Sequence, residues 1–169
     1  MIEDIFLKSS TGELLQLSGR IDDCLGRLTD DQIWMRNSEN QNSVGNLVLH
    51  LCGNVRQWIG FGVAGKPDIR ERDGEFAARG GVQIADLRER LKATIAEAAD
   101  IIRNVPAARL SEKTTIQNYD VTVLEAILHV VEHFAQHTGQ IIFATKLLTG
   151  EDLGYYKHLN KPKHFETTP

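Results

Sequence analysis

Four long stretches of the chain place apolar side chains at intervals of three or four residues. They span about residues 3–28, 44–65, 82–105 and 122–148. That spacing is typical of helices with one buried face, whereas almost no segment shows the alternation of a strand. A chain of 169 residues is long enough for one sizeable core. The pattern therefore predicts an all-α four-helix bundle that forms a single domain over residues 1–169.

Polar residues mark where the predicted helices begin and how they connect. Asn42 or Ser43 can cap the second helix, and Thr122 with Glu125 forms a capping box for the fourth. Residues 66–81, KPDIRERDGEFAARGG, lack sustained periodicity and are longer than a tight loop needs. We therefore expect a long crossover between the second and third helices. The segment EKTTIQNYDV is expected to be extended or irregular.

A stripe of histidines lies in the fourth helix, in the sequence LHVVEHFAQHTGQ, where His129, His133 and His137 stand four residues apart. Imidazoles separated by one helical turn can bind one metal ion. The alternatives are a solvated polar stripe, or buried histidines satisfied by hydrogen bonds. The flanking residues are mostly apolar, and burying unpaired imidazoles costs several kcal/mol. This context favours a metal, which would need a ligand from elsewhere in the chain.

His50 is the other histidine inside an apolar helix, in the sequence NLVLHLCGN. Helical spacing places Ser43, Asn46, Asn54 and Gln57 on the same face. Amides beside a buried histidine suit a site where they orient a ligand imidazole. A core histidine that is satisfied next to solvated amides is the alternative.

The sequences SVGNLVLHLCGN and HVVEHFAQHTGQI together resemble the DinB-like superfamily of metal-binding four-helix bundles, in a branch of unknown function. The resemblance covers about residues 10–160. It implies that His50, His133 and His137 are the metal ligands and that His129 lines the cavity or contacts a ligand, with direct coordination left open. It also implies that Gly139, of the GQ pair, lets a neighbouring helix approach closely. Many relatives have a basic residue where this chain has Thr138.

Three neutral histidines leave a position open on a divalent ion, which is the arrangement of catalytic sites. Imidazole suits zinc, nickel, copper and iron, and zinc or nickel is expected. The resemblance implies a thiol-dependent transferase or isomerase that uses a low-molecular-weight thiol and a small-molecule substrate. The alternatives are a metal-dependent hydrolase and a non-catalytic, stress-related metal-binding module.

A hydrolase would need a general base near the metal. Glu132 points away from His133, so it is poorly placed, whereas Asp73 and Glu75 in the crossover could reach the bundle. The charged block RERDGEF has three interpretations. It is a solvated face, an ion-pair network anchored by Phe76, or a substrate-anion site formed by Arg70 or Arg72.

Other features bound the class of protein. The net charge of −4 argues against nucleic acid as a partner. The sequence shows no signal peptide and no membrane span, so a cytoplasmic location is expected. Cys24 and Cys52 are read as buried small hydrophobes, and the tryptophans as core or cavity wall. His158 and His164 are expected to be solvated, and a homodimer is expected from the resemblance alone.

Overall fold

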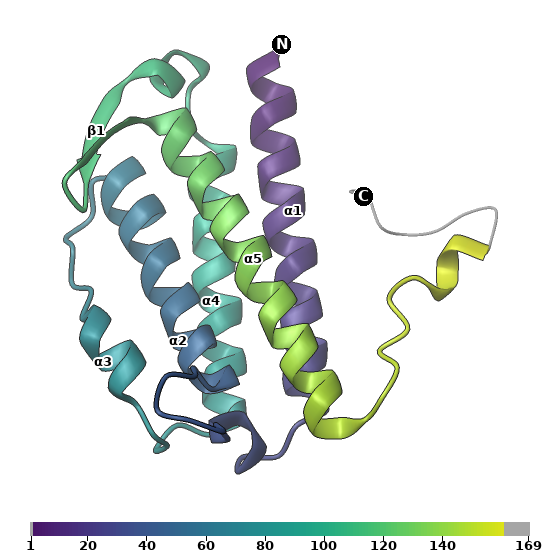
Figure 1. The fold of residues 1–169 in the computed structure, drawn as a ribbon. Helices are drawn as coiled ribbons and strands as arrows, with labels where there is room; N and C mark the ends of the chain where they lie inside the picture. The colour runs from purple at the N-terminus through teal and green to yellow at the C-terminus, as the bar shows by residue number, and fades with distance from the viewer. Residues whose placement is uncertain (1, 161–169) are drawn as a thin grey trace.

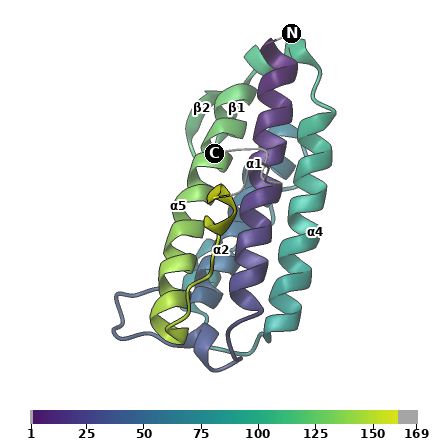
Figure 2. The same cartoon turned by 90° about the vertical axis from the view of Figure 1, so that its right-hand side faces the viewer.

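Four long helices lie side by side in the computed structural model, which describes residues 2–160 (Figures 1 and 2). They are α1 (Ile2–Leu25), α2 (Val44–Val55), α4 (Ile84–Arg103) and α5 (Val123–Thr149). The predicted four-helix bundle is confirmed. No helix in the described part of the chain is both long enough and apolar enough to cross a membrane.

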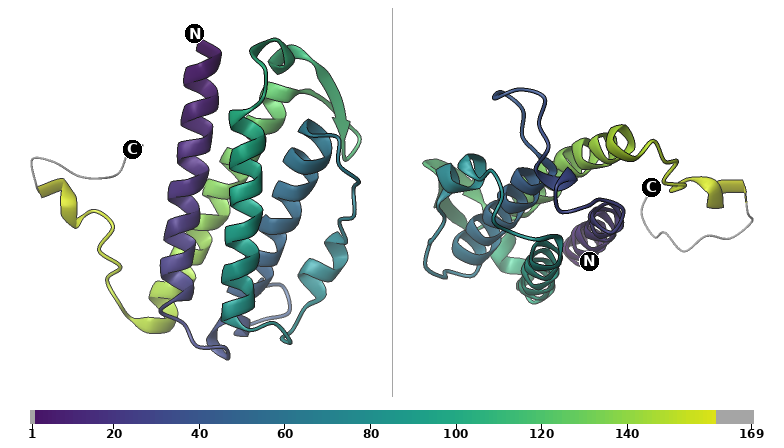
Figure 3. Two further views of the ribbon diagram at one scale, coloured as in Figure 1. Left: turned by 180° about the vertical axis from the view of Figure 1, so that it is seen from behind. Right: turned by 90° about the horizontal axis from the view of Figure 1, so that it is seen from below.

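Every long helix contributes to one apolar core. Helix α1 packs against α4 and α5, and α2 packs against the same two helices (Figure 3). The largest fully buried side chains come from all four of them, and include Leu14, Ile21, Leu51, Ile95 and Phe134. Burial of this kind contributes about 1.5–3 kcal/mol for each large apolar side chain, so the mutual packing of the apolar faces stabilises the bundle.

The helix ends follow the capping residues in the sequence. The Ser43 hydroxyl accepts a hydrogen bond from the Asn46 backbone N–H, and the Asn46 side chain accepts one from the Ser43 N–H. Thr122 and Glu125 form the predicted capping box of α5. Gly150 ends that helix in the left-handed conformation, with φ of 71°. The predicted ends of α5 are confirmed within a residue.

Helix α2 continues as a π-helix, η2 (Arg56–Val63), which the sequence analysis did not foresee. The π-helix packs closely against the β-hairpin that precedes α5. A Cβ added at Gly62 would lie 2.1 Å from Cδ1 of Ile116, which belongs to that hairpin. Ile116 itself is fully buried. The absence of a side chain at Gly62 thus lets the hairpin close over this end of the bundle.

The hairpin consists of β1 (Lys113–Ile116) and β2 (Tyr119–Thr122), which pair antiparallel. It joins the 3-10 turn η3 (Ala107–Ser111) to the start of α5. Gln117 and Asn118 both have positive φ, 51° and 65°, as a two-residue type I′ turn requires. The extended alternative for this segment is confirmed.

The crossover between α2 and α4 contains a helix that was not predicted, α3 (Arg72–Ala77). It lies on the outer side of α2 (Figure 1). The Asn46 side-chain amide donates to the backbone carbonyls of Glu75 and Ala78, at 2.9 Å each. Six residues are too few to show periodicity, and Asn46 holds this short helix against α2.

Two 3-10 turns complete the described chain, η1 (Gln32–Trp34) and η4 (Lys157–Asn160). Trp34 is half-buried, packs on Gly45 and donates its indole N–H to the Val82 carbonyl. This contact closes the end of the bundle where α2 and α4 begin. Cys24 and Cys52 are buried and unpaired, as predicted.

Candidate metal centre

Helices α2 and α5 bring the three predicted ligands together. His50 lies in the middle of α2, and His133 and His137 lie one turn apart on α5. Nε2 of His133 is 3.1 Å from Nε2 of His50 and 3.2 Å from Nε2 of His137. One ligand nitrogen from each histidine lies within 4.8 Å of the others, so the three could hold a metal ion.

The hydrogen bonds behind the rings indicate which nitrogens face the common point. Nδ1 of His50 is 3.1 Å from Oε2 of Glu75, and Nδ1 of His137 is 2.7 Å from Oε1 of Gln140. With the protons assigned to these Nδ1 atoms, both Nε2 atoms present lone pairs toward His133. A single N–H on His133 can satisfy only one of them, whereas a cation satisfies all three rings.

The spacing of the nitrogens also fits a metal. Zinc–nitrogen bonds of about 2.0–2.1 Å in tetrahedral geometry place two ligand nitrogens about 3.3 Å apart. The two closest pairs in the cluster, at 3.1 and 3.2 Å, are near this value. Two of the three pairs therefore already have the spacing of ligands on one tetrahedral ion, and the third pair lies within 4.8 Å.

The two imidazoles from α5, His133 and His137, favour the neutral form that a metal requires. Burial, together with the neighbouring histidines and Arg70, lowers the pKa of His133 to about 3. Burial also lowers the pKa of His137, although the hydrogen bond to Gln140 opposes the effect. Protons therefore compete weakly for these lone pairs at neutral pH.

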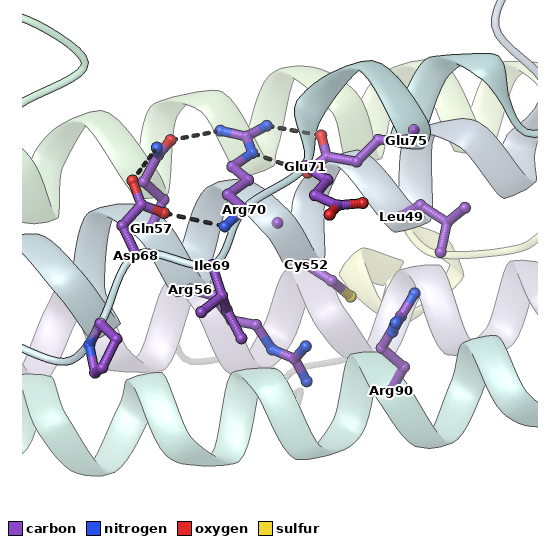
Figure 4. A pocket seen from close by; sticks show the side chains of 13 residues that line it. Leu49, Cys52, Arg56, Gln57, Asp68, Ile69, Arg70, Glu71, Glu75 and Arg90 are labelled. Atoms are coloured by element: carbon purple, nitrogen blue, oxygen red, sulfur yellow. Dashed lines mark hydrogen bonds and ion pairs between the residues drawn. The ribbon is translucent and has the colours of Figure 1, made fainter.

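Glu75 holds His50 from behind and is itself held by Arg70. Nε and Nη2 of Arg70 donate to the two carboxylate oxygens of Glu75, both at 2.8 Å (Figure 4). Burial would raise the pKa of Glu75, but the hydrogen bonds from Arg70 and His50 and the Arg70 charge hold it below its usual value. An ionised carboxylate on Nδ1 fixes the ring and strengthens Nε2 as a ligand.

Gly53 provides the space for this carboxylate, one turn after His50. A Cβ built on Gly53 would lie 1.8 Å from Oε1 of Glu75 and 3.1 Å from Nε of Arg70. Any side chain at this position would displace the ion pair. The glycine inside the otherwise apolar LHLCGN motif was a signal that sequence reasoning did not use.

The structure decides among the interpretations of the charged crossover. The ion-pair network is confirmed, with Arg70 and Glu75 as its centre. The Arg70 side chain is only 3% exposed and is committed to Glu75, so the substrate-anion role suggested for it is wrong. Phe76 packs on His50, with ring centroids 4.7 Å apart, and the Arg72 guanidinium lies over the Phe76 ring, 5.0 Å from its centroid. Asp73 is exposed and makes no hydrogen bond or ion pair within the described residues.

The amides around His50 serve the crossover more than the ring. The side-chain Oε1 of Gln57 accepts a hydrogen bond from Nη1 of Arg70 at 2.9 Å, and the side-chain NH2 group of Gln57 donates to Asp68 at 2.8 Å. Asn46 holds α3, and Asn54 is buried with no partner for Oδ1 among the described residues. The expectation that these amides orient His50 directly is therefore wrong for Asn46 and Gln57.

His129 lies beside the cluster rather than in it. Its ring lies 3.9 Å from the Trp58 ring and stacks at 5.5 Å on His133. Trp58 is buried and forms the wall there, as expected. The geometry therefore supports a role for His129 as a neighbour of the candidate metal ligand His133. It does not support direct coordination by His129, because the group that could hold an ion consists of His50, His133 and His137.

The GQ pair, Gly139 and Gln140, follows the last histidine of the stripe on α5. A Cβ built on Gly139 would have no neighbour within 4 Å among residues 2–160, which include every long helix, so the predicted close approach of another helix is wrong. Gln140 contacts His137 and is the residue of the GQ pair that touches the site. The side chains of His158 and His164 lie outside the part that the structure describes.

Comparison with known proteins supports the fold and the family. Residues 2–163 match the family described as "Protein of unknown function (DUF1572)". The chain belongs to this family. A search of curated proteins finds no match.

Two solved structures are similar to this DUF1572 chain. A DinB-like protein from Bacillus subtilis has a TM-score of 0.68 at 15% identity, over 88% of this chain and 97% of that one. A conserved protein from Enterococcus faecalis has a TM-score of 0.71 at 18% identity, over 85% and 97% of the respective chains. At these identities the matches establish the DinB-like fold.

Proposed function

We propose that this protein binds one divalent transition-metal ion, zinc or nickel, through Nε2 of His50, His133 and His137. The observation that carries the proposal is the convergence of the three Nε2 atoms from two separate helices. The Glu75–Arg70 pair behind His50 and the Gln140 amide behind His137 support it. Partners of this kind orient ligand histidines and are costly to remove.

The proposed activity is a thiol-dependent transfer or isomerisation that uses a low-molecular-weight thiol. A divalent ion with three protein ligands keeps an open position and lowers the pKa of a thiol or water bound there. Such activation needs no protein base, because the thiol loses its proton near neutral pH. The chain contributes by holding the three imidazoles in place, with Phe76 packed on His50 and His129 stacked between Trp58 and His133.

Hydrolysis is less well supported, because it usually needs a general base. Glu75 is the carboxylate that is hydrogen-bonded to the cluster among the described residues. It already accepts from Arg70 and His50, and its pKa is lowered, so it is a poor proton acceptor.

A metal-binding module without turnover is the second candidate. Thr138 stands where many relatives of the resembled superfamily have a basic residue, and it is 1% exposed. Its hydroxyl donates to the Phe134 carbonyl at 2.8 Å, so this position supports the helix and does not contact a substrate. A charged substrate would therefore need another cationic group.

The cellular context remains part of the proposal. We propose a cytoplasmic homodimer that takes a small-molecule substrate and no nucleic acid. The acidic net charge supports the last point. Exposed apolar side chains on α5, Phe143 at 65% and Leu147 at 68%, support association through that helix.

Metal analysis followed by a thiol panel tests the proposal. Purified protein should bind one zinc or nickel ion per chain, and His133→Ala should abolish binding, whereas His129→Ala should retain it. The loaded protein is then assayed with low-molecular-weight thiols and electrophilic substrates. Turnover supports the transferase, and full occupancy without thiol binding supports the non-catalytic module. Unchanged metal content in His133→Ala would contradict the proposal as a whole.

A further inference from the structure

A second site lies on the face of α2 that is turned toward the crossover and α4. It is a cavity of about 350 Å³, lined on one side by the crossover and on the other by residues of α2, η2 and α4 (Figure 4). Its volume is in the range of small-molecule sites. Arg70 and Glu75 form part of its wall, so this cavity and the histidine cluster share one ion pair.

Two arginines that line the cavity have no partner. Arg56 comes from η2 and Arg90 from α4, and neither guanidinium makes a hydrogen bond or ion pair within the described part of the chain. Both residues are exposed, and Figure 4 shows their guanidiniums flanking the Cys52 sulfur, one on each side of it. Two positive charges beside one cavity, whose donors have no acceptor among the described residues, form an arrangement that recognises oxyanions.

The other charged groups of the cavity leave these two guanidiniums unpaired. Arg70 is paired with Glu75, and Asp68 keeps its charge but accepts from the Gln57 side chain and the Arg70 backbone N–H rather than from Arg56 or Arg90. Burial raises the pKa of the Cys52 thiol to about 11, so this part of the wall is uncharged. Glu71, the third carboxylate of the lining, lies above Cys52 in Figure 4, away from the two guanidiniums, and makes no ion pair within the described residues.

We propose that this cavity binds a small molecule through a carboxylate or phosphate group held between Arg56 and Arg90. The lining carries three arginines and three carboxylates, so its formal charge is zero, and an anion is attracted by the two unpaired guanidiniums and not by a net positive charge. Glu71 and Asp68 repel the same anion and lower its affinity. The site is separate from the metal proposal, because its donors come from η2 and α4 and none is a histidine.

The shared ion pair makes the cavity a neighbour of the metal centre. An anion at Arg56 and Arg90 lies in the same cavity as the Arg70–Glu75 pair, whose carboxylate contacts Nδ1 of His50. A bound anion would therefore lie next to the ion pair whose carboxylate is hydrogen-bonded to the His50 ring. Binding itself does not require the metal.

Calorimetric titration of the full-length, chelator-treated chain at low ionic strength tests the site. The probes are inorganic phosphate and succinate, with dimethyl succinate as the uncharged control. We expect saturable binding of at least one anion with one site per chain, and none of the diester. Loss of two charge-assisted contacts in the double variant Arg56→Gln/Arg90→Gln should weaken binding by at least roughly tenfold.

Three variants separate this site from general charge effects and from the metal centre. Lys92→Gln/Arg103→Gln removes two exposed charges of α4 that do not line the cavity, and should bind as the parent does. His133→Ala should also bind normally, and Glu71→Gln should bind more tightly. Absence of saturable binding for both anions, or equal weakening in the two double variants, would overturn the proposal. Loss of anion binding in His133→Ala would assign the anion to the histidine cluster instead.

Discussion

Oε2 of Glu75 lies 3.1 Å from Nδ1 of His50, although the two residues come from different helices and Glu75 belongs to the crossover. This contact links the irregular part of the chain to the candidate metal centre. The carboxylate is in turn fixed by Arg70 and by the gap at Gly53. The geometry of His50 therefore depends on the crossover as well as on α2.

Replacing Glu75 with glutamine should weaken metal binding without removing any ligand. The amide cannot supply the charge that supports His50, and loss of such a partner typically costs roughly 10- to 100-fold in metal affinity. Competition with a chromogenic chelator measures the change. Glu71→Gln, four residues earlier and exposed, is the matched control. Equal affinities for the Glu75 variant and the parent would show that the contact is incidental.

Gly53→Ala should destabilise the fold and weaken the metal site together. The added Cβ would overlap Oε1 of Glu75, and overpacking of this kind costs about 1–3 kcal/mol. Thermal unfolding and metal titration measure the two effects. Gly139→Ala is the control, because its Cβ meets no atom within 4 Å, and a mid-helix Gly→Ala change should stabilise by about 0.5–1 kcal/mol. A Gly53 variant that melts at the parent temperature would contradict the assignment.

Metal-free protein should lose stability as the pH falls from 7 to 5. In the unfolded state the histidines take up protons near their ordinary pKa of 6.5. In the folded state burial lowers the pKa of His133 to about 3 and also lowers the pKa of His129 and His137. The unfolded state thus binds more protons in this window, and acid favours it. Melting temperatures of chelated protein measure the slope. It should be shallower in His133→Asn, and an unchanged slope would contradict the buried neutral ring.

Both cysteines should be inert in the folded protein. Cys24 and Cys52 are buried, and burial raises the pKa of Cys52 to about 11, so little thiolate exists at pH 8. A thiol-reactive chromophore should label neither residue in native protein and both in denaturant. Rapid labelling of one thiol under native conditions would reopen a role for it in chemistry.

The elements that sequence reasoning predicted well are those with local signals. Thr122 and Glu125 mark the start of α5 through a contact over three residues, and the apolar spacing marks the four long helices. The spacing of His133 and His137 places them on one face by helical geometry alone. Their meeting with His50 is a tertiary contact, which the resemblance to a known family supplied.

The parts that were missed depend on contacts between segments distant in sequence. Glu75 was named as a group that could reach the bundle, but nothing local shows that Arg70 neutralises it or that Gly53 makes room for it. Helix α3 is too short to be periodic and is held by Asn46. The π-helix η2 has no sequence signature, since its widened turns accompany the packing of Ile116 on Gly62.

Anomalous diffraction from crystals of metal-loaded protein, collected at the absorption edge of the bound element, would locate the ion and its ligands in one experiment. We expect one anomalous peak per chain, within bonding distance of Nε2 of His50, His133 and His137, and its loss in crystals of His50→Ala. A peak bound elsewhere on the chain, or one that persists at full height without His50, would contradict the three-histidine site.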